Sequence, residues 1–389
     1  MVYRNNHYVP QLVLRRYNTE KLTVYDIKTG EVHKDMKLNE IFAEQDLYGE
    51  EIEISLSKNI ELSFAQILNQ KILPAEVGSE IELTRKELYI IKKFLLIEQM
   101  RIFQADKEEW YKFSQHVSDW MSKLYNFPFR EVKKENETVK DRWLRTLRVL
   151  LESKDFTHVQ NHEMCTNEAY YWALIYHSGY LAIWDCTGTG EEFIITDIGM
   201  TSEREKGAPI GLEVQKKLYL KEIYERAKSK RQKDLYAKLS FQQQFFHENF
   251  YMFSISKTRM LVIINPFFRL YDKAERVVKP YIWPSLIEGR ELFKKNRMPD
   301  LKADSKGYPI LSDEDLFGYT VHPMLLEDFR WVNILMLDRV QNILGFSDIE
   351  KIADSVCDYK EFYDNVLKRP MMVDYDPLIK YFKDNGIID

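Results

Sequence analysis

Residues 180–196 read YLAIWDCTGTGEEFIIT, and this stretch decides the fold class. The apolar runs Tyr180–Asp185 and Phe193–Thr196 are typical of β-strands. The intervening Thr187-Gly188-Thr189-Gly190 predicts a hairpin turn. Its Gly-x-Gly is followed by a second strand and not by a helix, so it does not predict a phosphate-binding loop. We therefore expect an antiparallel hairpin here.

Two further hairpins are predicted outside this stretch. One runs through Lys21–Asp26, turns at Lys28-Thr29-Gly30-Glu31 and returns through Val32. The other pairs Tyr251–Ile255 with Met260–Ile264. The rest of the chain has mostly helical periodicity. Helices are predicted over residues 51–71, from 84 to about 125, and over 139–151, 163–176, 214–238, 286–295, 325–344, 347–357 and 360–367.

Together these elements predict an α+β fold that is mostly α-helical, with a small, mainly antiparallel β-sheet built from hairpins. Residues 1–275 are expected to form the main domain, interrupted by a basic helical insertion at about 203–247. Residues 276–389 are expected to form a mostly helical C-terminal extension that packs on the main domain.

Composition limits the class of protein. The 389 residues are 45% hydrophobic and 30% charged, which excludes a disordered chain. The net charge of −5 means that contact with nucleic acid requires a local basic patch. The three cysteines are far apart in sequence and have no metal-type spacing. With no signal peptide and no apolar run long enough for a membrane span, we expect a cytoplasmic protein without a membrane partner.

The N-terminus carries the most distinctive motif. His7-Tyr8-Val9-Pro10-Gln11 is followed by Leu14-Arg15-Arg16-Tyr17. In a solvated tail these apolar side chains would be exposed to water, so we expect this segment to be docked on the protein. Pro10 favours extended geometry at Val9, which would present His7 on one side and place the arginine pair deeper in the fold.

This motif is similar to the opening of a mostly bacterial family, domain-of-unknown-function family 4238. Its members begin with His-Tyr-Val-Pro-Gln, followed by Leu-Arg and an aromatic residue. Four later pieces resemble the family in the same order: Leu22–Asp26, the acidic Ile60-Glu61, Glu98-Gln99-Met100-Arg101, and Phe193–Asp197. The resemblance covers residues from about 5 to 270. One departure is that Ile198-Gly199-Met200 stands where the family usually has Asn-Pro after the aspartate.

The resemblance places a family motif at each of five charged residues: His7, Arg16, Glu61, Arg101 and Asp197. His7, Glu61 and Asp197 are residue types that bind a divalent metal, which we expect to be Mg²⁺ or Mn²⁺. Arginine recognises phosphate or carboxylate in a planar, bidentate manner. His7, Glu61, Arg101 and Asp197 are the predicted catalytic residues. The alternative is that all five form buried ion pairs.

Several other residues are candidates for binding. Gln11, Arg15, Arg16 and Gln99 are predicted to bind substrate, although each glutamine could instead satisfy backbone groups. His158 and His162 have the i, i+4 spacing of a zinc site but lack the accompanying glutamate, so a solvated helix start is the default.

A basic segment at 216–238 is the best candidate for contact with nucleic acid. The alternative is a solvated amphipathic helix. The residues predicted to bind nucleic acid are Lys228, Lys230, Arg231 and Lys233.

The leading hypothesis is a metal-assisted hydrolase of a phosphodiester or nucleotide, nuclease-like and involved in phage defence. It needs no covalent nucleophile, and the chain contains no Gly-x-Ser-x-Gly motif. The rival is a non-enzymatic binding or regulatory protein of a defence or toxin-type system that recognises nucleic acid or a protein partner. A third hypothesis, a purely structural network, predicts that every buried charge is paired.

Overall fold

The computed structural model describes residues 5–102, 136–204, 248–264, 297, 299, 301–305, 307, 309–368 and 370–388. The strands are β1 (Asn5–His7), β2 (Lys21–Asp26), β3 (Glu31–Lys37), β4 (Ala43–Gln45), β5 (Glu80–Thr84), β6 (Tyr180–Asp185), β7 (Ile195–Thr196), β8 (Thr201–Arg204), β9 (Glu248–Ser254), β10 (Arg259–Ile264), β11 (Leu316–Pro323) and β12 (Ile343–Phe346). The α-helices are α1 (Gln11–Leu14), α2 (Glu50–Ser55), α3 (Leu62–Ile67), α4 (Arg85–Ile102), α6 (Val139–Glu152), α7 (Phe156–Asn161), α8 (Asn167–Ser178), α12 (Leu326–Leu337), α13 (Ile349–Glu361) and α14 (Asp376–Asp384). Three π-helical segments, η1 (Leu56–Glu61), η2 (Leu68–Ile72) and η5 (Phe362–Leu367), and the 3₁₀ turn η3 (Thr187–Thr189) complete the described elements.

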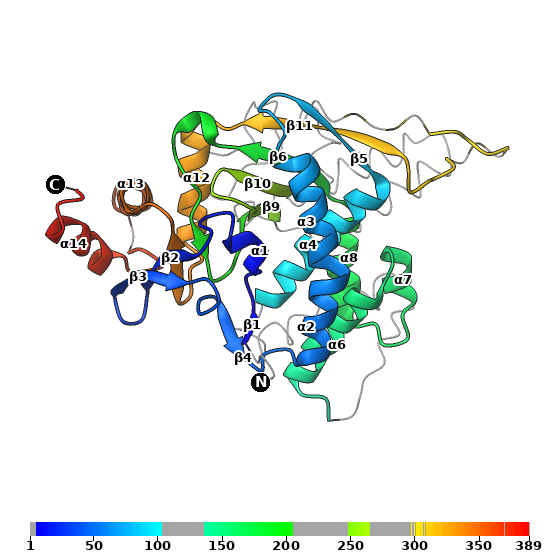
Figure 1. Ribbon diagram of the computed structural model, residues 1–389, viewed down its shortest axis with the longest axis horizontal. Helices are drawn as coiled ribbons and strands as arrows, with labels where there is room; N and C mark the ends of the chain where they lie inside the picture. Colours follow the sequence, from blue (N-terminus) through cyan, green and yellow to red (C-terminus); the bar gives the residue numbers. More distant parts are fainter. Residues whose placement is uncertain are drawn as a thin grey trace.

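The chain has an α+β fold, and its strands form three sheets (Figure 1). The orders are β1-β4, β5-β11-β6-β10-β9-β8 and β3-β2-β12-β7. Among the described strands, β6 and β11 are the single parallel pair. The predicted hairpins β2–β3 and β9–β10 are confirmed. One small sheet was expected; the structure instead has a six-stranded and a four-stranded sheet together with the short β1–β4 pair.

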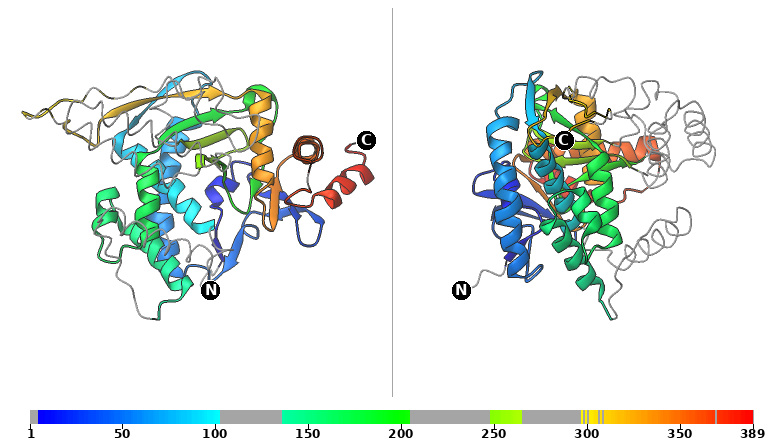
Figure 2. Two further views of the ribbon diagram at one scale, coloured as in Figure 1. Left: turned by 180° about the vertical axis from the view of Figure 1, so that it is seen from behind. Right: turned by 90° about the vertical axis from the view of Figure 1, so that its right-hand side faces the viewer.

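The central strands β6, β9 and β10 of the six-stranded sheet are buried on both faces, which explains their nearly continuous apolar sequences. In β6, Leu181 and Ile183 belong to a core shared with α4 and α8. The alternating residues Ala182 and Trp184 belong to a second core shared with α12 and α13. Figure 2 shows helices on either side of this sheet. The alternation follows from the two-residue period of a strand.

The hairpin predicted within residues 180–196 is wrong. Strand β6 pairs with β10 and β11, whereas β7 pairs with β12 in the other sheet. The predicted turn is the 3₁₀ turn η3, which ends at Gly190 with a left-handed φ of 77°. The backbone N–H of Phe193 then donates to the Lys257 carbonyl at 2.7 Å. The chain is therefore held by the β9–β10 turn as it crosses to the four-stranded sheet.

The helix predicted over 325–344 ends early, at Leu337, and β12 follows it. The cause is a carboxylate from elsewhere in the chain. Asp197 accepts hydrogen bonds from the backbone N–H groups of Gln341, Asn342 and Ile343. These groups are therefore unavailable for the i→i−4 bonds of a helix.

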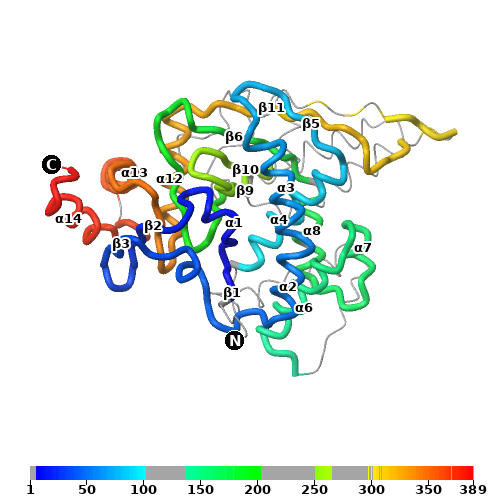
Figure 3. The backbone as a smooth tube through the Cα atoms, in the orientation of Figure 1, coloured from blue at the N-terminus to red at the C-terminus, as the bar shows by residue number. Residues whose placement is uncertain are grey.

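The last part of the chain contributes to both large sheets. Strand β11 lies between β5 and β6, and β12 lies between β2 and β7. The expected C-terminal extension, 276–389, thus shares sheets with the first half of the chain. Figure 3 shows the N-terminal segment between the α2–α8 helices and the four-stranded sheet. Within the described ranges, no helix combines the length and apolar character that crossing a bilayer requires.

Candidate functional site

The helical stretch from α2 to η2 carries an apolar residue at every fourth position. In an α-helix, four residues overshoot one turn by about 40°. Turns with i→i+5 bonds contain more residues, so the segments η1 and η2 compensate for this overshoot. The apolar positions therefore stay on one face, and all six are buried: Ile52, Leu56, Ile60, Phe64, Leu68 and Ile72.

The same geometry aligns the residues that directly follow each apolar position. These residues are Glu53, Ser57, Glu61, Ala65 and Asn69. Asn6 donates to Glu53 at 3.3 Å near one end of this row, and Arg16 donates to Asn69 near the other. We call the line of contact formed by Asn6, His7, Gln11, Arg15 and Arg16 with Glu53, Glu61 and Asn69 the N-terminal seam.

The N-terminal segment is docked, as its sequence predicted. Strand β1 pairs with β4. Val9 and Leu14 are buried, with exposed fractions of 1% and 0%. The arginine pair is not deeper in the fold, however, because Arg15 is exposed and Arg16 is only half-buried. Both guanidinium groups therefore lie at the surface end of the seam.

Helix α4 brings Arg101 beneath the seam. Its guanidinium lies 2.5 Å from Glu61 and 4.0 Å from Glu98. Burial raises the pKa of Glu98 to about 8; the charge of Arg101 opposes this shift and that of Glu61 adds to it. Burial likewise raises the pKa of Glu53, which feels the same two charges. The charge of Arg101 thus acts on three carboxyl groups, of which Glu61 and Glu98 lie within 4.0 Å of its guanidinium. We call these four residues the Arg101 cluster.

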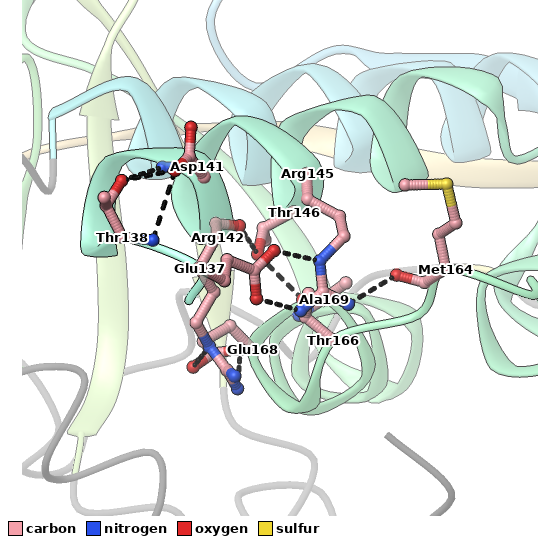
Figure 4. A network of polar contacts seen from close by, with 10 residues as sticks. All are labelled: Glu137, Thr138, Asp141, Arg142, Arg145, Thr146, Met164, Thr166, Glu168 and Ala169. Atoms are coloured by element: carbon pink, nitrogen blue, oxygen red, sulfur yellow. Dashed lines mark hydrogen bonds and ion pairs between the residues drawn. The ribbon is translucent and has the colours of Figure 1, made fainter. Parts of the chain in front are cut away.

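Buried arginines elsewhere in the protein are paired differently. Arg142 holds Glu168 through two hydrogen bonds of 2.8 Å, and Arg145 holds Glu137 at 2.6 and 2.5 Å (Figure 4). Each of these pairs has one carboxylate in bidentate geometry, the usual form of a structural ion pair. Among the described residues, the Arg101 cluster departs from this pattern because it has three carboxyl groups for one guanidinium.

His7 lies at the centre of the seam. Its Nε2 is 3.3 Å from the Leu38 carbonyl oxygen. The Leu38 contact requires a proton on Nε2, because a carbonyl only accepts. Nε2 also lies 3.2 Å from the amide nitrogen of Gln11, a donor, and that contact requires the other tautomer, with the lone pair on Nε2. The Gln11 amide oxygen accepts from Arg15 at 3.1 Å. Burial lowers the pKa of His7 below 6.5, which the Leu38 bond and Glu61 partly offset, so the imidazole is neutral at pH 7.

Arg15 and Arg16 have amide partners but no acidic ones. Within the described residues, neither guanidinium has a carboxylate within the ion-pair distance of 4.0 Å. The Nε of Arg16 is buried and has no hydrogen-bond partner in that part of the chain. This end of the seam therefore has uncompensated positive charge.

Gln99, a predicted ligand-binding residue, belongs to the core. It is 4% exposed, and its amide oxygen accepts a hydrogen bond from the Tyr176 hydroxyl. This contact joins α4 to α8. Gln99 therefore contributes to the packing between these helices, through a side-chain hydroxyl and not through the backbone groups of its alternative interpretation.

Asp197 lies apart from the proposed metal ligands. Its oxygens accept from the 341–343 segment, at distances from 2.7 to 3.3 Å. The charges that act on His7 are those of Glu61 and Arg101. Burial raises the pKa of Tyr8, and the charge of Asp197 adds to this shift. The predicted ligand set is therefore divided: His7 and Glu61 meet at the seam, whereas Asp197 holds a loop.

The other predicted sites add little to the seam. His162 lies 3.1 Å from Glu152, and His158 accepts from the Lys154 backbone, so both rings have local partners. No group of three or more His, Cys, Asp or Glu side chains among the described residues could hold a metal ion. The basic residues Lys228, Lys230, Arg231 and Lys233 lie outside the described ranges.

Sequence reasoning missed Glu53 and Glu98 as site residues. Glu98 lies in the quoted Glu98-Gln99-Met100-Arg101 segment, three residues before the arginine, and that spacing places the two on one helix face. Glu53 lies eight residues before Glu61, twice the four-residue spacing of the apolar row. That repeat was a usable signal for both glutamates of the seam.

The chain belongs to the family described as Protein of unknown function (DUF4238), whose sequence profile matches residues 5–297. This range contains the N-terminal seam and the Arg101 cluster. Neither the curated proteins nor the solved structures contain a significant match to the chain.

Proposed function

We propose that this protein is a cytoplasmic hydrolase of a phosphodiester or nucleotide, nuclease-like in its chemistry, with its acid–base residues in and beside the Arg101 cluster. The observation that carries the proposal is the surplus of carboxyl groups around Arg101. Among the described residues, the ion pairs of Arg142 and Arg145 each join one guanidinium to one carboxylate. Buried groups whose pKa values are displaced in opposite directions are typical of acid–base sites.

The roles follow from the protonation states. Glu98 keeps its proton at neutral pH, because burial raises its pKa to about 8. It is the proposed donor to the leaving oxygen. The unprotonated ring nitrogen of neutral His7 is the proposed acceptor of a proton from the attacking water. The water oxygen then forms the new P–O bond while the old P–O bond breaks. His7 takes the proton of the water, and Glu98 gives its proton to the leaving oxygen.

Arg15 and Arg16 are the proposed anion-binding residues, because they lack acidic partners within the described residues. A requirement for Mg²⁺ or Mn²⁺ stays a prediction, and no step is assigned to a metal. The free thiols Cys165, Cys186 and Cys357 are consistent with the cytoplasm. Phage defence also stays a prediction.

The test is turnover of bis(p-nitrophenyl) phosphate, with and without Mg²⁺ or Mn²⁺. Glu98→Gln should lower kcat by about 10²- to 10⁴-fold, the usual contribution of a positioned acid or base. The control is Glu192→Gln, which removes a half-buried carboxylate bound by Lys257 and Lys351. It should leave kcat unchanged.

The proposal fails if the wild type shows no turnover under any of these conditions, or if Glu98→Gln turns over as fast as the wild type. A protein that is stabilised by nucleic acid or nucleotide without turning it over would support the rival function, a binding or regulatory protein.

A further inference from the structure

His7 has two hydrogen-bond contacts that exclude each other. Its Nε2 lies 3.3 Å from the Leu38 carbonyl oxygen and 3.2 Å from the amide nitrogen of Gln11. The carbonyl needs a proton on Nε2, whereas the amide nitrogen, a donor, needs a lone pair there. Burial lowers the pKa of His7, so the ring is neutral at pH 7 and carries one proton. Only one of the two hydrogen bonds therefore forms at a time.

Arg15 decides which end of the Gln11 amide faces the ring. The Arg15 backbone N–H donates to the Gln11 carbonyl at 3.0 Å, so one turn of α1 holds both side chains on one face. A guanidinium has only donors, and the Nη2 of Arg15 donates to the Gln11 amide oxygen at 3.1 Å. The amide therefore turns its NH₂ group towards His7. This orientation favours the lone pair on Nε2 and the proton on Nδ1, at the expense of the Leu38 bond.

The opposite orientation of Gln11 becomes favourable when Arg15 leaves. A rotated amide presents its oxygen to the ring, and a proton on Nε2 then serves both this oxygen and Leu38. Arg15 is exposed, and no carboxylate among the described residues lies within 4.0 Å of it. Its Nη2 belongs to both edges through which a guanidinium binds an anion in bidentate geometry, so an anion competes with Gln11 for that nitrogen. The anion is the better partner, because charge-assisted hydrogen bonds are about twice as strong as neutral ones.

We propose that Arg15 and Gln11 form a switch that sets the tautomer of His7: the proton lies on Nδ1 while Arg15 holds Gln11, and on Nε2 when a phosphate group draws Arg15 away. The ring gives its Nδ1 proton to water and takes one from water at Nε2, so its charge does not change. Gln11 is a positioning residue, because it acts through His7.

The consequence for catalysis rests on the proposed function. Both contacts of the His7 ring within the described residues are made by Nε2. The phosphate-bound state therefore leaves a lone pair on Nδ1 without a donor in that part of the chain. In the free state the lone pair is on Nε2, where the Gln11 amide occupies it. An anion on Arg15 thus prepares His7 to accept a proton.

Nitrogen NMR of the full-length protein with isotope-labelled histidine measures the tautomer directly, because protonated and unprotonated ring nitrogens have separate shifts. The His7 signals are assigned by their loss in His7→Ala. Arg15→Ala should raise the ratio of the Nε2–H to the Nδ1–H form by about 2- to 13-fold, the factor that one neutral hydrogen bond provides. The matched control is Arg148→Ala, at an exposed arginine on α6, which should leave the ratio unchanged.

Gln11→Glu separates the switch from other effects of the arginine. A carboxylate only accepts, so it can take hydrogen bonds from Arg15 and from the Nε2–H of His7 at once. At a pH at which the spectrum shows a neutral ring, the proton should stay on Nε2, and adding Arg15→Ala should no longer change the ratio. Inorganic phosphate at constant ionic strength should shift the wild-type ratio in the same direction as Arg15→Ala, and should have no effect in Gln11→Glu.

Three results would overturn the proposal: a free wild type with its proton already on Nε2, an unchanged ratio in Arg15→Ala, or a wild-type ratio that phosphate does not shift. None of these measurements depends on turnover. A tautomer that follows Arg15 in a protein without phosphodiester turnover would support the switch and refute the hydrolase. Turnover with a tautomer that ignores Arg15 would support the hydrolase and refute the switch.

Discussion

Replacing Glu98 by glutamine should stabilise the protein at neutral pH, although the residue is buried beside an arginine. Glu98 is 4% exposed, and burial raises its pKa from 4.5 to about 8. The folded protein therefore holds this proton more tightly than the unfolded chain does. Glutamine has a similar shape and no proton to lose, so it removes this difference between the two states.

The magnitude follows from the two pKa values. The contribution of Glu98 to stability is fully present below pH 4.5 and is lost as the pH rises towards 8, because the unfolded chain ionises first. At about 1.4 kcal/mol per pH unit, the wild type loses about 3 kcal/mol between pH 4.5 and pH 7. Glu98→Gln should therefore be more stable than the wild type by about 3 kcal/mol at pH 7, and by much less at pH 5.

Urea unfolding of both proteins between pH 5 and pH 8 measures this difference. The matched control is Glu168→Gln, which removes the carboxylate that buried Arg142 holds in bidentate geometry. Breaking that pair should destabilise the protein by about 3–5 kcal/mol. The two glutamates are equally buried but should respond with opposite sign.

The reasoning would be refuted if Glu98→Gln lost several kcal/mol, as Glu168→Gln should. It would also be refuted if the difference between Glu98→Gln and the wild type did not change with pH. Either result would mean that Glu98 is an ionised structural partner of Arg101.

Three further predictions concern other parts of the chain. Asp197→Asn should lower the melting temperature, because the amide keeps only one of the two acceptor oxygens and leaves backbone N–H groups of the 341–343 segment without an acceptor, at about 1–3 kcal/mol each. A melt in which this loss appears only in the presence of Mg²⁺ would indicate a metal ligand instead. Deleting residues 1–11 should lower the free energy of unfolding by at least about 1.5–3 kcal/mol, the contribution of the buried Val9 side chain. An unchanged melting temperature would contradict the docked N-terminus. The third change neutralises together four basic residues outside the described ranges: Lys228, Lys230, Arg231 and Lys233. The melting temperature should stay unchanged, and the salt dependence of any nucleic-acid binding should flatten. An unaltered salt dependence would show that these residues do not contact nucleic acid.

Local signals predicted much of the fold. The helix predicted from residue 84 begins with a capping box, in which the Thr84 hydroxyl accepts from the Glu87 backbone at 3.1 Å. The hairpins β2–β3 and β9–β10 were predicted because each has a short turn between its strands. The pairing of β7 with β12 joins residues about 150 positions apart, which no local pattern indicates. The end of α12 likewise depends on the distant Asp197.

The candidate site was predictable only in part. The motifs identified His7, Glu61 and Arg101, which the fold brings together through the seam and α4. Asp197 uses its carboxylate to hold the 341–343 segment, and metal binding by the predicted set stays a prediction. The surplus of carboxyl groups could not be inferred from spacing, because it depends on which side chains are buried together.

The central claim is that Glu98 carries a proton at neutral pH within a cluster that has more carboxyl groups than cations. Infrared difference spectroscopy of the wild type against Glu98→Gln measures this most directly. We predict the carbonyl stretch of a protonated carboxyl group at pH 7, replaced by carboxylate bands as the pH rises above about 8. A spectrum with only carboxylate bands from Glu98 at pH 7 would contradict the account.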